Sequence, residues 1–498
     1  MKNSAITYLA LDLGASSGRA IAGTLDKGML SIKPVNRFTN GYFELGETLY
    51  WNFIGLWADV VQSMKRCAEL GYTKLAGIGV NTWGVDYGLI GSDGQLVSNP
   101  VCYRDKSTKG MPEVIASKIS DEQIYKITGL APGRVATLPQ LVAVSHGSGT
   151  YRLKTAKRLL MMPGLFRYFL CGDCSVELSA AGSSLMLDIR SGKWSTKILR
   201  SFGIPAGLLP DVIKPGRIVG KLKAALAGQT GLNQAPIVAV AGHDTLSAGA
   251  AIPYIDDDCA FIICGTWSVA GQILDRPITT LQALRHGFVN EPGLESILFA
   301  RNMMGLFVFE ALHRSLERKG EKVSYAAMVK AASAAKPFKG FLDMNSPLFF
   351  VTADPEEDVK KFLSGTCQKV SLKKGELIRS ILEGLAFSYR EALQQLGEIT
   401  GNKLNRICLV GGGTRNNLLC QMAADATGLE VLAGPAEATI AGNLGVQALA
   451  TGLLKTPTDI RELVRRSFKI DIYKPENTQL WVKHYDKYMD IRKKSKNI

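Results

Sequence analysis

Short apolar runs that stop directly at glycine or polar residues recur along this chain and limit the folds it can adopt. A strand covered on one face alternates apolar and polar residues, whereas these runs are apolar almost throughout, which indicates strands buried on both faces. Strands of this kind that alternate with helical patterns predict an α/β fold. We expect them at Ile6–Asp12, Leu75–Asn81, Ile237–Ala241, Cys259–Ile263 and Ile407–Val410.

Two later segments carry a helical pattern. Over Glu376–Leu396 apolar residues recur at steps of three and four, which predicts a long helix. A second helix is expected over Asn417–Thr427, because Gly428 follows it and glycine readily adopts the left-handed conformation that ends helices. After Lys483 the sequence favours neither a charged helix nor a frayed tail.

Length and composition place the chain among globular proteins with more than one domain. Its 498 residues, 46% of them hydrophobic and 21% charged, exclude a fully disordered or fibrous chain. No uncharged apolar run reaches the roughly 18 residues of a membrane span. The apolar N-terminal run is interrupted by Asp12, which makes a poor secretory signal. We therefore expect a cytoplasmic protein with no membrane partner.

Neither the cysteines nor the net charge point to a special partner. The one close cysteine pair, Cys171 and Cys174, lacks the second C-x-x-C or H-x-x-x-H of a zinc site, so we expect ordinary thiols. The formal charge of +15 has no aromatic-interleaved basic motif, which favours a solvated basic surface over a nucleic-acid partner. Positive potential would also attract an anionic substrate such as a nucleotide. Much of the excess lies at Lys483, Lys487, Arg492, Lys493, Lys494 and Lys496.

Two strand–turn–strand segments resemble each other and lie about half of the chain apart. Each has an apolar strand, a glycine, a short turn with hydroxyl side chains and a second apolar run; the glycines are Gly14 and Gly265. Backbone N–H groups and hydroxyls in such turns can hold phosphate oxygens, and glycine allows a close approach. The pair suggests two similar lobes that each present one such turn, although two ordinary hairpins would give the same pattern.

Two aspartates follow predicted strands at places suited to chemistry. Asp12 ends the first strand beside the first turn, where a carboxylate can hold Mg²⁺ or cap the turn, and Arg19 beyond it can contact a phosphate. Asp244 follows the strand Ile237–Ala241, and ligands of open α/β sheets lie outside the carboxyl ends of strands. Asp244 is thus a candidate general base for a sugar hydroxyl that attacks a phosphoryl group, or else a helix N-cap.

The usual nucleotide-binding motifs are absent, so any nucleotide must bind through the loops of another fold. There is no G-x-x-x-x-G-K-[ST], no G-x-G-x-x-G between strand and helix, and no protein-kinase signature. Gly411–Gly413, between a predicted strand and helix, offers flat backbone for a purine. Trp83 offers an apolar face for a sugar ring or packs in the core, and Asp86 can accept hydrogen bonds from sugar hydroxyls.

Taken together, these residues resemble the FGGY carbohydrate kinases from Asp12 to about Gly452. Each motif is modest alone, but their order and spacing are specific. They are Asp12–Arg19, Thr82–Tyr87, Tyr103–Asp105, Gly242–Thr245, Gly265–Ser268, Asn302–Gly305, Gly411–Gly413 with Asn416, Ala433–Ala438 and Gly442–Asn443.

The resemblance implies the actin-like ATPase fold, with two ribonuclease-H-like lobes and a central cleft. It implies an N-terminal lobe of residues 1–247 with the sugar site and first phosphate loop, and an ATP-binding C-terminal lobe of residues 248–498. It also implies ATP- and Mg²⁺-dependent phosphorylation of a ketose at its C1 hydroxyl, by a monomer or a homodimer. L-rhamnulose is the expected ketose, with L-fuculose and L-xylulose as alternatives.

The resemblance also assigns roles to single residues. Asp244 matches the catalytic base and Asp12 the acid near the metal. Sugar-side positions match Gly84, His243, Asp244, Thr245 and Asn302. ATP-side positions match Ala15, Ser16, Ser17, Gly18, Arg19, Thr266, Glu310 and Gly411. The two turns are expected to hold the triphosphate from opposite lobes.

Several positions depart from the family pattern and leave the exact sugar open. Asn81 stands where an Asp is usual, Ala136 where an Asn is usual, and Gly164 where a second Asp is usual. Cys264 replaces a Ser, and Glu310 replaces an ATP-side Gln. A catalytically silent relative that senses sugar or nucleotide is the alternative of a different class, and the presence of both Asp12 and Asp244 argues against it.

Overall fold

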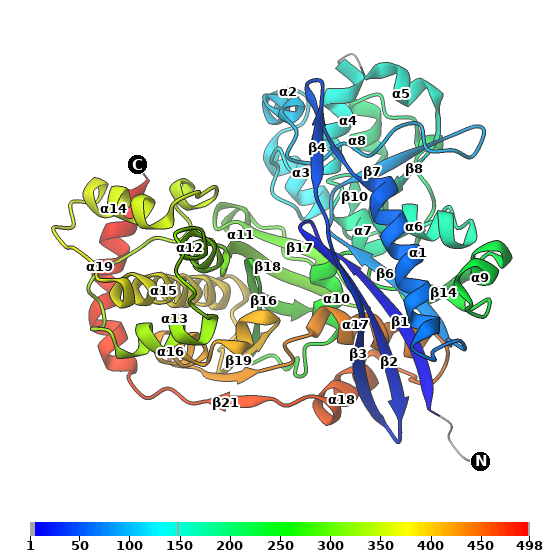
Figure 1. Cartoon of the computed structure of the whole chain (residues 1–498). Helices are drawn as coiled ribbons and strands as arrows, with labels where there is room; N and C mark the ends of the chain where they lie inside the picture. Colours follow the sequence, from blue (N-terminus) through cyan, green and yellow to red (C-terminus); the bar gives the residue numbers. More distant parts are fainter. Residues whose placement is uncertain (1–4, 147–148, 497–498) are drawn as a thin grey trace. The chain divides into compact units, whose positions relative to one another are not determined.

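The computed structural model describes residues 5–146 and 149–496 and divides into two compact units, each made of three chain segments. The first unit contains the chain up to Pro253, Leu274–Phe299 and Ala438–Phe468. The second contains Tyr254–Ile273, Ala300–Glu437 and the chain from Lys469 onward. The chain therefore enters the first unit three times, and Figure 1 shows its course by colour.

A six-stranded mixed sheet forms the centre of the first unit. Its strand order is β13-β14-β6-β1-β2-β3, and β1, β2 and β3 are drawn in dark blue in Figure 1. β1 pairs antiparallel with β2 and parallel with β6, and β6 pairs parallel with β14. The bounds are β1 Ile6–Leu13, β2 Ser17–Asp26, β3 Met29–Thr39, β6 Gly77–Thr82, β13 Arg217–Lys221 and β14 Pro236–Ala239.

The second unit repeats the hairpin of the first. β15 pairs antiparallel with β16 and parallel with β19, as β1 does with β2 and β6. β20 then pairs parallel with β19 and antiparallel with β21. The bounds are β15 Cys259–Cys264, β16 Trp267–Leu274, β19 Arg406–Val410, β20 Glu430–Ala433 and β21 Asp471–Tyr473. The predicted α/β class, the five strands and both hairpins are thus confirmed.

The strand β1 shows why the sequence is apolar without alternation. Leu9 and Leu11 belong to a core cluster that includes α1 (Phe53–Glu69), whereas Tyr8 and Ala10 belong to one that includes α17 (Ala438–Ala450). Neighbouring residues of a strand point to opposite faces, so both faces of β1 are covered by helices. This removes all four side chains from water and fixes the strand end, where Asp12 lies.

The predicted helices are also present. α15 spans Lys374–Thr400, and α16 spans Asn417–Thr427 with Gly428 as a left-handed cap at φ 73°. The sequence left the segment after Lys483 open; it is helical, because α19 (Thr478–Ser495) buries Trp481 and Tyr488.

The other elements complete the two units. The strands are β4 Tyr42–Leu45, β5 Thr48–Trp51, β7 Tyr87–Gly91, β8 Ala156–Met161, β9 Val176–Glu177, β10 Leu187–Asp188, β11 Lys193–Trp194, β12 Val212–Ile213, β17 Phe288–Pro292 and β18 Ile297–Met304. The α-helices are α2 Met111–Ala116, α3 Asp121–Thr128, α4 Thr137–His146, α5 Thr150–Thr155, α6 Met162–Cys171, α7 Leu178–Gly182, α8 Thr196–Ser201, α9 Ala224–Thr230, α10 Asp244–Ala250, α11 Leu281–Arg285, α12 Phe307–Arg318, α13 Tyr325–Ala334, α14 Pro355–Gly365 and α18 Pro457–Ser467. Single 3₁₀ turns are η1 Lys106–Thr108, η2 Ala206–Leu208, η3 Pro347–Phe349 and η4 Gly412–Arg415.

Candidate active site

Asp244 lies at the first position of α10, just beyond the end of β14. Its side chain is 36% exposed, so the carboxylate is accessible from solvent. Its Oδ1 accepts hydrogen bonds from the backbone N–H of Thr245 at 2.6 Å and from the Thr245 hydroxyl at 3.3 Å. The helix N-cap is His243, so the alternative of Asp244 as N-cap is wrong. Oδ2 has no such donor among the described residues, which leaves one carboxylate oxygen available to a substrate.

Asp12 lies at the end of β1, and the strand register places its two partners beside it. Arg19 is opposite it on β2, and Asn81 is opposite it on β6. The Arg19 Nε donates to Oδ2 at 2.8 Å, and the Asn81 Nδ2 donates to Oδ1 at 2.5 Å. Burial raises the pKa of Asp12, the ion pair with Arg19 opposes this rise, and the nearby charge of Asp244 adds to it. The two aspartates predicted to act together are therefore within electrostatic reach of one another.

Asn81 links Asp12 to a buried row of amides. The Asn443 Nδ2 donates to the Asn81 Oδ1 at 2.7 Å, and the Gln447 Nε2 donates to the Asn443 Oδ1 at 2.7 Å. An aspartate at position 81 would replace the donor to Asp12 by a second carboxylate, and like charges this close repel. The departure at Asn81 thus supplies a hydrogen bond to Asp12.

The turn between β6 and β7 is held in an unusual conformation at the site. Val85 has a φ of 69°, which is rare for a β-branched residue. Its N–H donates to the Ser183 hydroxyl at 3.0 Å, and its carbonyl accepts from the Thr137 hydroxyl at 2.7 Å. A Cβ on Gly84 would lie 3.1 Å from the His243 Nε2, so this glycine allows the imidazole to approach the turn. The expected sugar-side residues Gly84 and His243 are thereby brought together.

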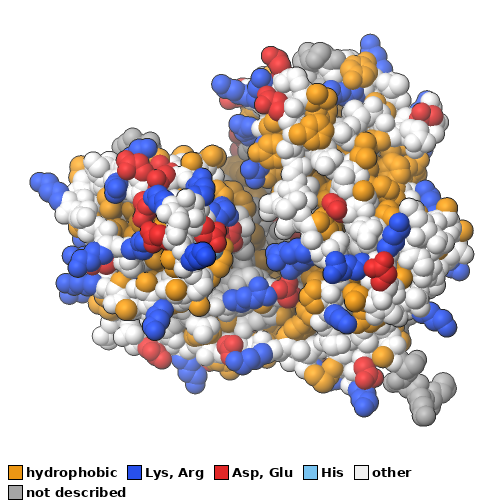
Figure 2. Space-filling view, viewed as in Figure 1, with side chains coloured by type: hydrophobic (Ala, Val, Ile, Leu, Met, Phe, Trp, Pro, Cys, Tyr) orange, Lys and Arg blue, Asp and Glu red, His pale blue; other side chains and the backbone are white. Residues whose placement is uncertain are grey.

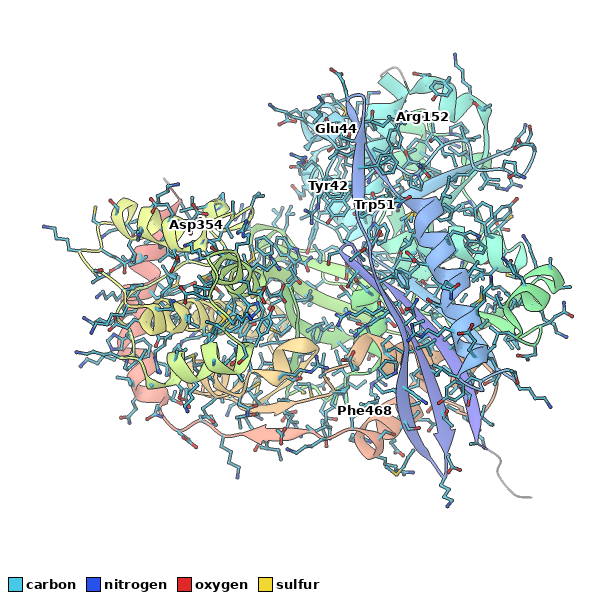
Figure 3. All side chains as sticks on the ribbon, in the orientation of Figure 1. Tyr42, Glu44, Trp51, Arg152, Asp354 and Phe468 are labelled. Carbon is cyan, nitrogen blue, oxygen red and sulfur yellow. The ribbon has the colours of Figure 1, made fainter. Side chains whose placement is uncertain are left out.

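Asp86 does not have the role that its position suggested. It is fully buried, and its Oδ2 accepts from the indole N–H of Trp51 at 2.6 Å and of Trp83 at 2.9 Å, while its Oδ1 accepts from the Gln140 amide at 2.9 Å. Burial raises its pKa to about 6. Trp51 ends the hairpin strand β5 and is labelled in Figure 3. Asp86 therefore anchors two indoles and an amide, and Trp83, only 5% exposed, is a core residue.

Two further departures from the family pattern are explained by packing. A Cβ on Gly164 would lie 3.2 Å from the Ser175 carbonyl oxygen, so a larger residue is crowded in α6. Ala136 is 5% exposed and belongs to the apolar cluster that surrounds α4. Both residues therefore shape the core of the first unit.

The turn between β1 and β2 is a closed hairpin, as predicted. The Gly14 N–H donates to the Ser17 carbonyl at 2.9 Å, and the Asn40 side chain donates to the Gly14 carbonyl at 2.7 Å. Ala15 and Ser16 lie at its tip, with Ser16 exposed. Gly18 is buried, and a Cβ there would lie 2.1 Å from the Phe38 ring, which explains the glycine by packing.

In the second unit the structure brings Thr266, Glu310 and Gly411 to the end of β15. The Thr266 hydroxyl donates to the Glu310 Oε2 at 3.4 Å, and burial raises the Glu310 pKa, with Arg314 opposing. Gly411 has a φ of 90°, and a Cβ there would lie 2.8 Å from the Cys264 carbonyl oxygen. Three expected ATP-side residues therefore lie around one turn.

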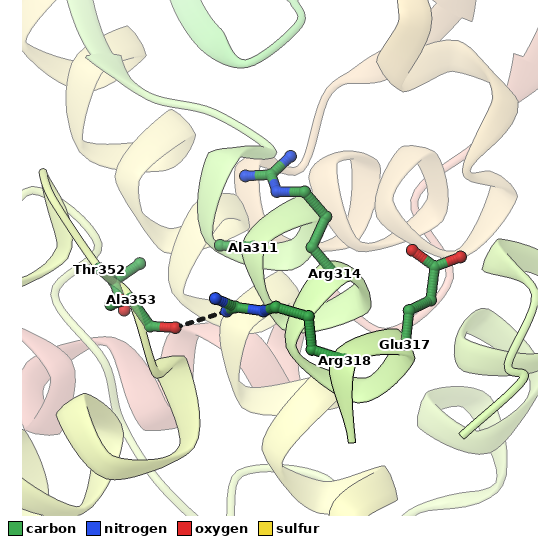
Figure 4. Close-up of a pocket in the computed structure, with 6 residues that line it drawn as sticks. All are labelled: Ala311, Arg314, Glu317, Arg318, Thr352 and Ala353. Atoms are coloured by element: carbon green, nitrogen blue, oxygen red, sulfur yellow. Dashed lines mark hydrogen bonds between the residues drawn. The ribbon is translucent and has the colours of Figure 1, made fainter. Parts of the chain in front are cut away.

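The remaining sugar-side residue, Asn302, is exposed on β18 in the second unit. Beside the same part of the unit, α12 lines a pocket of about 550 Å³, shown in Figure 4. Arg314 and Arg318 contribute cationic groups to it, and the Arg318 Nη2 donates to the Ala353 carbonyl at 2.8 Å. Glu317 also lines the pocket, and Arg314 lies one helical turn from Glu310, whose charge it offsets.

Sequence reasoning missed Glu291, which lies near His243 in the first unit. The Glu291 Oε1 is 3.8 Å from the His243 Nδ1, and the Asp244 Oδ1 is 3.6 Å from the His243 Nε2. Glu291 follows no glycine and ends no apolar run, so no local signal marks it. Only the fold brings β17 to the start of α10.

Among the described residues no group of three or more His, Cys, Asp or Glu side chains is arranged to hold a metal ion. The nine cysteines are free thiols in the structure, with Cys171 half-buried and Cys174 exposed. Within the same described ranges no helix has both the length and the apolar character needed to cross a membrane.

Two hairpin-led α/β units with a carboxylate at the end of a strand describe a sugar-kinase architecture, and the family comparison agrees. Models of the N-terminal and C-terminal domains of the FGGY family of carbohydrate kinases match residues 7–250 and 260–451. The chain belongs to this family and is a carbohydrate kinase, as the sequence motifs predicted.

Individual relatives agree along nearly the whole chain. A rhamnulokinase of Bacteroides thetaiotaomicron is 34% identical over 95% of this chain and 97% of its own length. A rhamnulokinase of Enterococcus faecalis is 33% identical over 98% of each chain. The fold is similar to a ligand-bound xylulose kinase from Lactobacillus acidophilus, with a TM-score of 0.79, 18% identity and 98% coverage of both chains. A glycerol kinase from Plasmodium falciparum with ADP has a TM-score of 0.77 at 14% identity, covering 99% of this chain and 98% of its own. The expected actin-like ATPase fold of FGGY kinases is thereby confirmed.

Proposed function

We propose that this protein transfers the γ-phosphoryl group of ATP to the C1 hydroxyl of L-rhamnulose and forms L-rhamnulose 1-phosphate. The observation that carries the proposal is the accessible carboxylate of Asp244 at the end of a strand, in a chain that aligns with rhamnulokinases over nearly its full length. A cytoplasmic enzyme of sugar catabolism that acts as a monomer or homodimer is the corresponding expectation.

Asp244 acts as the general base. Its Oδ1 is held by Thr245, which orients the carboxylate, and its Oδ2 accepts the proton of the C1 hydroxyl as this oxygen attacks the phosphorus. Phosphoryl transfer needs little covalent help from the protein, so orientation and charge provide most of the rate enhancement. His243 lies beside Asp244 and, with Gly84, forms one wall of the sugar site.

Each unit has a glycine-containing turn that can contact phosphate oxygens of ATP. In the first unit the turn residues Ala15 to Gly18 offer backbone N–H groups and hydroxyls, and Arg19 offers a guanidinium. In the second unit Thr266, Glu310 and Gly411 surround the matching turn. We assign four sugar-side residues, Gly84, His243, Asp244 and Thr245, to the first unit, and the sugar-side residue Asn302 and the adenosine part of ATP to the second unit.

Asp12 is suited to a magnesium ion that accompanies ATP. A carboxylate has about four acceptor positions, and Arg19 and Asn81 use two of those on Asp12. Mg²⁺ in phosphoryl-transfer sites is held by one or two carboxylates together with water and phosphates, so Asp12 can contact the ion directly or through water. When bound, the ion would neutralise charge on the phosphates.

Replacing Asp244 by Asn tests the mechanism. We expect kcat to fall by about 10²- to 10⁴-fold, the usual contribution of a general base, while the Kd for ATP changes less than about twofold. Asp121 occupies the same first position of α3 in the same unit and is exposed, so Asp121→Asn is the matched control and should keep wild-type kinetics. Near-normal turnover of Asp244→Asn would reject the assigned base.

A panel of ketoses tests the substrate. The departures at Asn81, Ala136 and Gly164 keep L-fuculose and L-xylulose as alternatives, because they lie in the unit that contains most of the assigned sugar-side residues. We expect the highest kcat/KM with L-rhamnulose. A clear preference for another ketose would reject the named substrate and leave the kinase activity in place.

A further inference from the structure

Glu291 is a half-buried carboxylate that accepts no hydrogen bond from the residues that the structure describes. It lies on β17, and its side chain is only 13% exposed. Among the residues that the structure describes, the nearest cationic or polar nitrogen is the His243 Nδ1 at 3.8 Å, which is beyond hydrogen-bond distance. A carboxylate that is largely shielded from water is costly without donors, so a ligand that supplies hydrogen-bond donors would be favoured here.

The neighbouring imidazole of His243 also has a nitrogen without a hydrogen-bond partner. The His243 Nδ1 is buried and has no hydrogen-bond partner, although the residue itself is fixed by its backbone N–H, which donates to the Ser179 hydroxyl at 3.1 Å. The ring lies between two carboxylates, with Asp244 on the Nε2 side and Glu291 on the Nδ1 side. Two unpaired polar groups thus lie next to the proposed base.

Two fully buried carboxylates, Glu177 and Glu383, are hydrogen-bonded through both of their oxygens. Glu177 accepts from the Ser179 N–H at 2.8 Å, the Ser179 hydroxyl at 2.6 Å and the Gly242 N–H at 2.8 Å. Glu383 accepts from the Arg379 Nε at 2.7 Å and from the Phe338 N–H. Glu291 differs from these two carboxylates, because no described residue donates to it and its oxygens are left available to a ligand.

The backbone around Glu291 is nevertheless fixed. A Cβ on Gly182 would lie 2.5 Å from the Pro292 ring, so α7 packs closely against the end of β17. The same helix carries Ser179, which holds His243. One short helix therefore positions both unpaired groups relative to each other.

We propose that Glu291 is a specificity-determining residue that accepts hydrogen bonds from ketose hydroxyls on the side of His243 away from Asp244. This inference rests on the proposed sugar-kinase function and adds to it a residue that selects the hydroxyl pattern of the sugar. An ionised carboxylate only accepts hydrogen bonds, and a polyhydroxylated ketose supplies donors. A sugar that lacks the matching hydroxyl leaves the buried carboxylate unpaired, which is how buried polar groups reject analogues.

Glu291→Gln and Glu291→Ala test the proposal. For the ketose that the wild-type protein prefers, we expect kcat/KM to fall by about 10- to 100-fold, mainly through KM, with the KM for ATP changed less than about twofold. The kcat/KM of Glu291→Asp for this ketose should lie between the values of Glu291→Gln and the wild type. A set of monodeoxy analogues of that ketose should include one that the wild type discriminates against and that Glu291→Ala does not.

Thermal unfolding separates this role from a structural one. Removing an unpaired buried charge should leave the melting temperature of Glu291→Gln unchanged or raise it, whereas Glu383→Gln, which removes a paired buried charge, should lower it and keep the wild-type KM for the sugar. An unchanged sugar KM and unchanged analogue discrimination in Glu291→Ala would overturn the inference and leave the proposed function intact.

Binding of ketoses without ATP, measured by calorimetry, keeps the two proposals distinguishable. If the wild type binds a ketose but does not phosphorylate it, the proposed function fails, and the loss of binding in Glu291→Ala still supports Glu291 as a sugar contact. If the wild type binds none of the ketoses in the panel, both proposals are overturned.

Discussion

At the scale of single residues, Asp86 shows what a sequence can and cannot reveal about a site. Its position after a strand suggested a contact to hydroxyls, as for Asp12 and Asp244. Trp83, which donates to Asp86, is close in sequence, but the donors Trp51 and Gln140 lie far upstream and far downstream. The sequence predicts where a carboxylate lies along a strand, but the donors that surround it depend on tertiary structure.

The burial of Asp86 has a measurable effect on stability. Its pKa is raised to about 6 in the folded protein, so the folded state binds this proton more tightly than the unfolded state, and stability falls as the pH rises towards 6. Asp86→Asn removes this dependence. Between about pH 4.5 and pH 7 we expect the unfolding free energy of Asp86→Asn to rise relative to the wild type by about 2 kcal/mol, measured by urea unfolding. If the unfolding free energies of the two proteins change in parallel with pH, the pKa of Asp86 is not raised in the folded protein.

At the scale of elements, the strands and the two hairpins could be predicted because their signals are local. Continuous burial makes β1 and β15 apolar, and Gly428 marks the end of α16. The return of α17 to the first unit could not be predicted, because its partners lie more than half of the chain away. This return supplies Asn443, which reaches Asp12 through Asn81.

The close packing of α17 against α10 depends on Gly442. A Cβ at this position would lie 1.7 Å from the Ser247 carbonyl oxygen, so Gly442→Ala must push the two helices apart. Because α10 begins with Asp244, we expect a loss of about 1–3 kcal/mol of stability together with a lower kcat. Urea unfolding and steady-state kinetics measure both effects.

Gly228→Ala is the control for this helix packing. Gly228 lies within α9, and no atom lies near the position of an added Cβ. Alanine there should be neutral or stabilise by up to about 1 kcal/mol, because it favours a helix more than glycine does. If Gly442→Ala behaves like Gly228→Ala, the close approach is not needed to hold Asp244.

At the scale of the whole molecule, the charge of +15 is dispersed over the face that Figure 2 shows. Lys and Arg side chains lie there among neutral and acidic ones. Part of the basic tail is structural, since Arg492 of α19 pairs with the buried Glu391 of α15 at 2.5 Å. The excess charge is better understood as a favourable potential for an anionic nucleotide.

The molecule as a whole should divide its ligands between the two units. Gly411 has a positive φ, and a side chain there would meet the Cys264 carbonyl, so Gly411→Ala must distort the turn that we assign to ATP. A ligand that binds the folded state raises its stability, by roughly 3 kcal/mol at a hundredfold excess over Kd. We expect ADP to raise the melting temperature of the wild type and to lose most of this effect in Gly411→Ala, while the shift caused by the ketose stays unchanged.

Gly401→Ala provides the comparison for backbone strain in the same unit. Gly401 has a φ of 74° and no atom near an added Cβ, so its replacement costs conformational energy without obstructing a turn. ADP and the ketose should therefore each still raise the melting temperature of Gly401→Ala, although the melting temperature of this variant without ligand is lower than that of the wild type. Equal loss of the ADP shift in both variants would mean that strain alone, at any position of the second unit, weakens nucleotide binding. A loss of the ketose shift in Gly411→Ala would instead contradict the assignment of separate binding roles to the two units.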